Sequence, residues 1–168
     1  MTKDRNWGPA IGYYDLARII YPNSGASHNQ LAVIALADGS HLRATYHLYR
    51  ALAVEEPHPS ANGNLEIEFK KSQEAEDKDD VATTDHPRDT QGSGESLVRC
   101  FMRLHARCFK GTESPDYEDD GNEVMHYLAI NLKERSLEGT FSKLILINIA
   151  AQYYAGVRLN GKYKEPSA

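Results

Sequence analysis

The stretch SGASHNQLAVIALADGSH, residues 24–41, decides the fold of this chain. It carries no Asp, Glu, Lys or Arg between Ser24 and Ala37, and small or apolar residues occupy almost every position. A helix that is apolar on all sides must be enclosed by other elements, because its whole surface avoids water. We therefore expect a helix packed between two neighbours, with Ser24 or Ser27 as its N-cap and Gly39 as its C-terminal turn.

Helices are expected on both sides of this stretch, at residues 9–21 and 41–54. Three positions in the first helix recur 34 residues later in the second, which is the period of tetratricopeptide repeats. The recurring positions are Ala10, Tyr14 and Ala17, matched by Ala44, Leu48 and Ala51. The stretch then fills the place of the first helix of the second repeat. The residues expected to face both neighbours are Leu31, Ala32, Ala35 and Leu36.

The first repeat lacks its first helix. The helix that contains Ala10 and Tyr14 matches the second half of a repeat, and the sequence before it is too short for a partner helix. We expect either a fragment of a longer protein or a truncated relative, with an apolar edge at Ala10 that another chain covers.

The composition changes in the middle of the chain. A helix is predicted at residues 60–73, and the stretch 74–95 that follows holds 8 acidic and 2 basic residues but almost no large apolar side chain. Such a stretch buries too little surface to offset its ordering entropy, so we expect a disordered acidic linker. The expected division is residues 1–73 for tetratricopeptide-like helices, 74–95 for the linker, 96–160 for a C-terminal helical block and 161–168 for a tail.

Three helices are predicted in the C-terminal block, at residues 95–109, 122–135 and 140–154. The first is amphipathic, because four apolar residues share one face. These are Leu97, Phe101, Leu104 and Cys108. The last contains the run LILINIA, which would also suit a buried strand, but no partner strand is visible elsewhere. We therefore expect an all-α fold, with tetratricopeptide-like repeats followed by helical hairpins in an α-α superhelix.

Composition and charge narrow the class of protein. The net charge is −5, and the linker alone contributes −6, so the flanking parts are nearly neutral and leave room for a local basic patch. The longest apolar run, residues 144–151, is far shorter than the roughly 20 residues of a membrane span. We expect a soluble intracellular protein without a membrane partner. Cys100 and Cys108 fit neither a zinc knuckle nor a redox pair, and we expect buried free thiols.

The sequence shows no enzyme signature. Its seven histidines form no ligand pair with a matching carboxylate, and it has neither a Gly-rich phosphate loop nor a nucleophile elbow. The segment DYEDDGNEVMHY, residues 116–127, resembles a calcium loop, but Tyr127 stands where a bidentate Glu is required. We expect no catalytic residues, no metal, no cofactor and no small-molecule substrate.

A row of basic residues is the first candidate site. Arg99, Arg103 and Arg107 lie four apart on one helical face, and Lys110 lies near the end of that helix. Such a row is suited to a nucleic-acid backbone, and three or four phosphate contacts would give a salt slope of roughly −2 to −4. The alternative is a solvated or salt-bridged face that meets the acidic linker.

Polar and aromatic residues of the repeats form the second candidate site. Asn29 and Gln30 lie early in the enclosed helix, where they either contact a partner in a groove or bridge neighbouring turns. Tyr14 and Tyr49 are candidates for the same groove, with core packing as the alternative.

The residues resemble a known family. The stretch YYDLARIIYPNSGASHNQLAVIALADGSHLRATYHLYRALAVEEPHPSANGNL, residues 13–65, is similar to the central tetratricopeptide-like region of the ever-shorter-telomeres and SMG proteins. The most specific motif is P-x-x-G-x-x-x-N-Q-L-A, formed by Pro22, Gly25, Asn29, Gln30, Leu31 and Ala32. LVRCFMRLHARCF and LILINIAA resemble the helical hairpins that follow in the family, across a similarly variable acidic insertion.

The resemblance implies a non-enzymatic helical scaffold of telomerase regulators and nonsense-mediated mRNA decay factors, in the nucleus or the cytoplasm. It implies protein partners in a ribonucleoprotein or mRNA-decay complex, with RNA or single-stranded DNA as a further ligand. The family's phosphopeptide-binding half lies upstream of Tyr14 and its PIN nuclease domain is not found after Ala155, so neither activity is carried over. Two other functions stay open: direct binding of single-stranded nucleic acid, and a truncated copy that only competes for partners.

Overall fold

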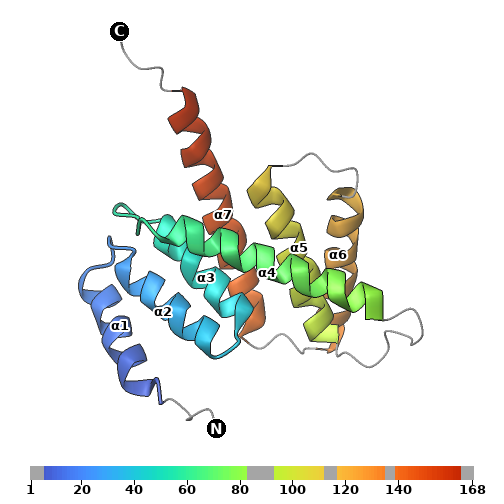
Figure 1. The fold of residues 1–168 in the computed structure, drawn as a ribbon, viewed down its shortest axis with the longest axis horizontal. Coiled ribbons are helices and arrows are strands. Elements are labelled where there is room, and N and C mark those ends of the chain that lie inside the picture. Colours follow the sequence, from blue (N-terminus) through green and yellow to red (C-terminus); the bar gives the residue numbers. More distant parts are fainter. Residues whose placement is uncertain (1–5, 83–92, 112–116, 135–138, 164–168) are drawn as a thin grey trace. The chain divides into compact units, whose positions relative to one another are not determined.

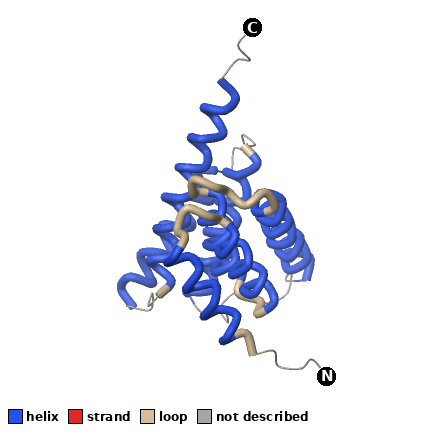
Figure 2. Tube along the Cα trace, turned by 90° about the vertical axis from the view of Figure 1, so that its left-hand side faces the viewer, coloured by secondary structure: helices blue, strands red, loops and turns tan. Residues whose placement is uncertain are grey.

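A computed structural model describes residues 6–82, 93–111, 117–134 and 139–163, which are helical for most of their length (Figure 1). The helices are α1 (Gly8–Ile20), α2 (Ala26–Ala37), α3 (His41–Leu52), α4 (Ala61–Ala82), α5 (Ser93–Lys110), α6 (Tyr117–Glu134) and α7 (Thr140–Tyr163). Figure 2 shows these helices joined by loops, and the described ranges contain no strand. The all-α prediction is confirmed. Over the same ranges, none of the helices has the length and apolar character needed to cross a membrane.

The enclosed helix α2 lies between α1 and α3, as predicted (Figure 1). Leu31, Ala32 and Ala35 are at most 1% exposed, and Leu36 is half-buried. The predicted N-cap is wrong, because α2 begins at Ala26 and neither Ser24 nor Ser27 caps it. Gly25 occupies the N-cap position, and it has no side chain with which to cap the helix. Gly39 forms the predicted turn with a positive φ of 70°, a conformation that favours glycine.

Two loops are joined beside the start of α2. The Gly25 N–H donates to the Glu56 carbonyl at 2.9 Å. The Tyr21 hydroxyl donates to the Glu56 carboxylate at 2.5 Å, and Asn23 Nδ2 donates to Glu55 Oε2 at 2.8 Å. A Cβ on Gly25 would lie 2.3 Å from the carbonyl oxygen of Ala51. The glycine of the P-x-x-G motif is therefore required for this close approach between the α1–α2 and α3–α4 loops.

The chain forms two compact units. The first contains residues 1–65 and 145–168, and the second contains residues 66–144. The helices α4 and α7 each contribute to both units. The sequence-based division of the chain, with residues 96–160 as one C-terminal block, stays a prediction. Within the first unit, the Tyr154 hydroxyl of α7 donates to Asn62 Oδ1 of α4 at 2.5 Å.

The second unit contains the hairpin of α5 and α6 (Figure 1). Leu97 and Phe101 are buried as predicted, and the rings of Phe69 and Phe109 pack with centroids 5.5 Å apart. Of the two cysteines, Cys100 is buried, but Cys108 is exposed, which corrects its predicted burial. The helix α6 begins at Tyr117 rather than at residue 122, because its acidic first turn suits the positive end of a helix dipole.

The helices reach into the stretch that we predicted to be a linker. The helix α4 continues to Ala82, and α5 begins at Ser93. The physical reason is that Glu, Ala and Lys in residues 74–82 favour helix through their intrinsic propensity. The rest of the linker prediction falls on residues 83–92, and most of the tail prediction on residues 164–168, which lie outside the described residues.

Candidate nucleic-acid and partner surfaces

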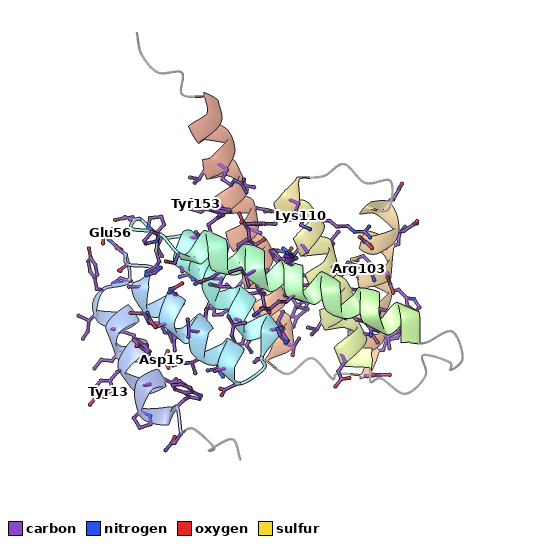
Figure 3. All side chains as sticks on the ribbon, in the orientation of Figure 1. Tyr13, Asp15, Glu56, Arg103, Lys110 and Tyr153 are labelled. Carbon is purple, nitrogen blue, oxygen red and sulfur yellow. The ribbon has the colours of Figure 1, made fainter. Side chains whose placement is uncertain are left out.

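The basic row of α5 is turned toward α6. Arg103 Nε donates to Asp120 Oδ1 at 2.9 Å, and its Nη2 donates to the carboxylate of Glu123. Arg107 Nη1 lies 2.8 Å from Asp120 Oδ2. Asp120 is only 4% exposed, so this carboxylate is enclosed between two guanidinium groups. Figure 3 labels Arg103 and Lys110 on α5.

The electrostatics of this cluster agree with a structural role. Burial lowers the pKa of Arg103, but the hydrogen bond to Glu123 and the two carboxylates more than offset this, so that the pKa is raised overall. Burial, together with Glu123, raises the pKa of the neighbouring Cys100 thiol to about 11. Two of the four predicted nucleic-acid contacts are thus neutralised by α6. This favours the salt-bridge alternative, although the acidic partner is α6 rather than the linker.

The second predicted site is divided between core and surface. Asn29 is 4% exposed, and its Oδ1 accepts a hydrogen bond from Asn64 Nδ2 at 3.1 Å. Tyr49 is 2% exposed and packs in the core. Both therefore have structural roles, and we remove them from the candidate partner site. Gln30 is exposed and Tyr14 is half-buried, so these two stay accessible.

A different basic face lies on α3. Arg43, His47 and Arg50 are spaced by four and three residues, which places them on one side of the helix, and Tyr46 lies next to them. The rings of Tyr46 and His47 have centroids 4.9 Å apart. Neither Arg43 nor Arg50 forms an ion pair with any residue in the described ranges. We call Arg43, Tyr46, His47 and Arg50 the α3 basic face.

His47 of this face is hydrogen-bonded to a histidine of α2. His28 Nδ1 of α2 lies 3.0 Å from His47 Nδ1 of α3, so one ring donates and the other accepts. Burial, and then Arg50 and Arg18, lower the pKa of His28 to about 4. Burial, and then His28 and Arg43, lower the pKa of His47 to about 3. Both rings are neutral near pH 7, so the positive charge here comes from the arginines.

The arginine of α1 contributes less positive charge to this surface than the two arginines of α3 do, because it is paired with an acid. Arg18 Nε donates to Asp15 Oδ1 at 2.8 Å, and both side chains are exposed. Asp15 also opposes the effect of the arginines on both histidines. The residues that the structure describes include no group of three or more His, Cys, Asp or Glu side chains that could hold a metal ion.

Sequence reasoning missed the α3 basic face, although the letters RATYHLYR show the same kind of spacing as the α5 row. The missing information is three-dimensional. A row of arginines looks the same in sequence whether or not another helix brings acids to it.

The outer face of α1 is apolar and exposed. Tyr13, Leu16, Ile19 and Ile20 are between 54% and 75% exposed. The repeat positions of α1 are also more exposed than those of α3. The α3 residues that match Ala10, Tyr14 and Ala17 of α1 are fully buried, whereas the α1 residues are half-buried or exposed. Figure 3 shows Tyr13 and Asp15 on this helix.

The fold and these surfaces define an all-α helical-repeat scaffold, and the comparisons agree. Residues 10–167 match the family described as Est1 DNA/RNA binding domain, and the chain belongs to this family. It is similar to a nonsense-mediated mRNA decay factor SMG7-like of Arabidopsis thaliana, with 48% identity over 67 residues, 40% of this chain and 8% of that protein. To the nonsense-mediated mRNA decay factor SMG7 of the same plant it is 34% identical over 129 residues, 77% of this chain and 12% of that protein.

A relative named as a telomerase-binding protein has a lower sequence identity to this chain. The telomerase-binding protein EST1A of Danio rerio is 26% identical over 131 residues, 73% of this chain and 8% of that protein. The chain therefore spans about a tenth of the length of the curated relatives it matches. The family and these relatives support a helical adaptor of the type found in telomerase and mRNA-decay factors.

Proposed function

We propose that this chain is the nucleic-acid-contacting module of an mRNA-decay adaptor, and that the α3 basic face makes the contact. The observation that carries the proposal is which arginines have acidic partners and which do not. Arg43 and Arg50 have no acidic partner in the described ranges and flank an aromatic side chain, whereas Arg103 and Arg107 are paired with α6.

The chemistry of this face suits a single strand. Arginines bind phosphate oxygens, and aromatic rings stack on bases that are not already stacked in a duplex. Tyr46 is half-buried, so part of its surface is available to a base. Two phosphate contacts predict a salt slope of about −1.4 for a single strand.

The relatives favour the decay branch over the telomerase branch. The two plant relatives named as mRNA decay factors are 48% and 34% identical, against 26% for the telomerase-binding relative. We propose that the chain acts without catalysis, in the cytoplasm or the nucleus, as part of a ribonucleoprotein complex with protein partners.

The experiment is fluorescence anisotropy of a labelled single-stranded RNA of about 12 nucleotides, titrated with the chain at low salt. We compare the Arg43→Glu/Arg50→Glu variant with a matched control, Arg99→Glu/Lys110→Glu, which makes the same change of charge on α5. We expect the α3 variant to bind at least about tenfold more weakly and the α5 control to change by less than about twofold.

Two other outcomes would contradict the assignment of the contact to α3. Loss of binding only in the α5 control would place the contact on the remaining ends of the α5 row. An absence of RNA and DNA binding by a chain with a cooperative thermal melt would contradict nucleic-acid contact and leave a protein-binding adaptor.

A second candidate function, protein docking, rests on the outer face of α1. This face leaves four large apolar side chains between 54% and 75% exposed, so it suits an apolar partner helix. Photo-crosslinking from Tyr13, which is 75% exposed, tests this in cells. We expect crosslinks to proteins of the decay machinery from Tyr13 but not from the exposed polar residue Ser60. Equal crosslinking from both positions would contradict a specific contact.

A further inference from the structure

A further arginine lies beside the α3 basic face, on α1. Arg18 is in the last turn of α1, and Arg50 is in the last turn of α3. Both helices are joined to α2 by short connections, so both run antiparallel to it and end beside its first turn (Figure 1). The Tyr21 hydroxyl after α1 donates to the Glu56 carboxylate after α3 at 2.5 Å, which joins these two helix ends. Arg18 and Arg50 therefore lie at the same end of the stack formed by α1, α2 and α3.

Arg18 lies on the side of α1 that packs on α2. Ile11 and Tyr14 of this side are half-buried, and Arg18 follows Tyr14 after four residues, which is the spacing of neighbours on one helical side. Its ion-pair partner Asp15 lies one turn before it, and Figure 3 shows Asp15 on the side of α1 next to α2. Both charges of α1 are therefore directed toward α2 rather than toward the outer apolar face.

The histidine pair lies between the arginines of the two helices. His28 is in the first turn of α2, and its Nδ1 lies 3.0 Å from Nδ1 of His47 on α3. Burial lowers the pKa of His28 most, followed by Arg50 and then Arg18. Burial also lowers the pKa of His47 most, followed by His28, Arg43 and Arg18. Arginines of α1 and α3 therefore approach the same neutral pair from its two neighbouring helices.

The ion pair between Arg18 and Asp15 is exposed. Arg18 donates to Asp15 Oδ1 through Nε at 2.8 Å, and neither of its Nη nitrogens has a hydrogen bond to a residue in the described ranges. The two side chains are 41% and 42% exposed, and an exposed pair of this kind contributes little stability. Asp120, which pairs with Arg103 and Arg107, is only 4% exposed. A phosphate therefore displaces Asp15 far more readily than it displaces Asp120.

We propose that Arg18 is a third phosphate-binding residue of the single-stranded RNA site on α3, and that Asp15 competes with the RNA for it. This inference rests on the proposed function and names a residue pair that sets its affinity. The competition is direct, because carboxylate and phosphate oxygens accept hydrogen bonds from the same guanidinium N–H groups. A strand that displaces Asp15 contacts arginines of two helices, Arg18 on α1 together with Arg43 and Arg50 on α3.

The salt dependence of RNA binding tests the proposal, with the same labelled single-stranded RNA of about 12 nucleotides as the probe. Asp15→Asn releases Arg18, so this variant should bind at least about threefold more tightly at low salt, with a slope of about −2.1 instead of about −1.4. The matched control is Asp38→Asn, which removes the same charge from the exposed C-terminal end of α2, away from His28. The control should change the affinity by less than about twofold.

The same substitution made without Arg18 separates competition from a general effect of charge. In an Arg18→Gln chain, Asp15→Asn should change the affinity by less than about twofold, because no guanidinium group is left to release. Equal gains from Asp15→Asn with and without Arg18, or an equal gain from Asp38→Asn, would overturn the proposal and leave the RNA contact on α3 intact. If the parent chain and Asp15→Asn both melt cooperatively but bind no RNA, this proposal and the proposed function are overturned together.

Discussion

Gly25 lies where two loops cross, and the residues around it explain the most specific motif of the chain. Its N–H donates to Glu56, and four residues later Asn29 accepts a hydrogen bond from Asn64 of α4. Both contacts join segments more than 30 residues apart. Gly25 and Asn29 of the motif therefore hold the repeats together, whereas Gln30 stays a candidate for partner contact.

The Gly25→Ala variant should unfold more easily. The added methyl would lie 2.3 Å from the Ala51 carbonyl oxygen, and this neighbour is backbone that cannot rotate away. Overpacking of this kind costs about 3 kcal/mol. The matched control is Gly63→Ala in α4, where a Cβ meets nothing within 4 Å and helix propensity should stabilise the chain by up to about 1 kcal/mol. Urea denaturation measures both, and equal stability of the two variants would contradict this account.

The histidine pair should make the chain sensitive to acid. The pKa of His28 is about 4 and that of His47 about 3 in the folded chain, below the usual 6.5. The unfolded state therefore binds more protons as the pH falls below 6.5, and the contribution of the pair to stability is lost between pH 6.5 and about 3.

Denaturation at pH 7 and at about pH 4.5 tests this window. The His28→Gln/His47→Gln variant should lose less stability between the two values than the parent chain does. The control is His41→Gln, which changes an exposed histidine at the start of α3 and should keep the parental pH dependence. An unchanged pH dependence in the double variant would contradict burial of the pair.

At the scale of elements, α1 and α3 carry the same repeat positions in different surroundings. Leu48 of α3 is fully buried, whereas the matching Tyr14 of α1 is half-buried, and the nearby Ile19 and Ile20 are 69% and 72% exposed. Leu48→Ala should therefore cost about 2–5 kcal/mol, whereas Ile19→Ser/Ile20→Ser should change stability by less than about 1 kcal/mol. Thermal and chemical denaturation measure both. A large loss from the α1 variant would mean that this face is already covered.

The hairpin of α5 and α6 should depend on one carboxylate. Asp120 is 4% exposed and lies within 2.9 Å of both Arg103 and Arg107. Asp120→Asn removes the charge from two charge-assisted contacts and should cost about 2 kcal/mol. The exposed neighbour Asp119 provides the control, and Asp119→Asn should have little effect. A stable Asp120→Asn chain would return Arg103 and Arg107 to the list of available cations.

The pattern of apolar and small residues predicted the elements well, because burial in helical repeats follows local sequence. The enclosure of α2 and the Gly39 turn could both be derived from residues 24–41. The end of α4 could not, since an acidic stretch without apolar residues can still be helical. The ion pairing of Arg103 could not be predicted from the sequence either, because its acidic partners lie 17 and 20 residues away on another helix.

At the scale of the whole molecule, the first unit is discontinuous in sequence. Residues 145–168 belong with the N-terminal helices, which no local pattern indicates. The family match covers both units, from residue 10 to residue 167. The first unit holds the α3 basic face and the outer face of α1. It is therefore the part of the molecule through which we expect an adaptor to make its contacts.

The most direct test of this account is the salt dependence of RNA binding. The slope of log K against log salt for a single strand changes by about 0.7 for each phosphate contact. The parent chain should show a slope of about −1.4 or steeper, and Arg50→Gln should reduce its magnitude by about 0.7. Arg99→Gln should leave it unchanged. A slope that is insensitive to Arg50 but reduced by Arg99→Gln would contradict the assignment of nucleic-acid contact to α3.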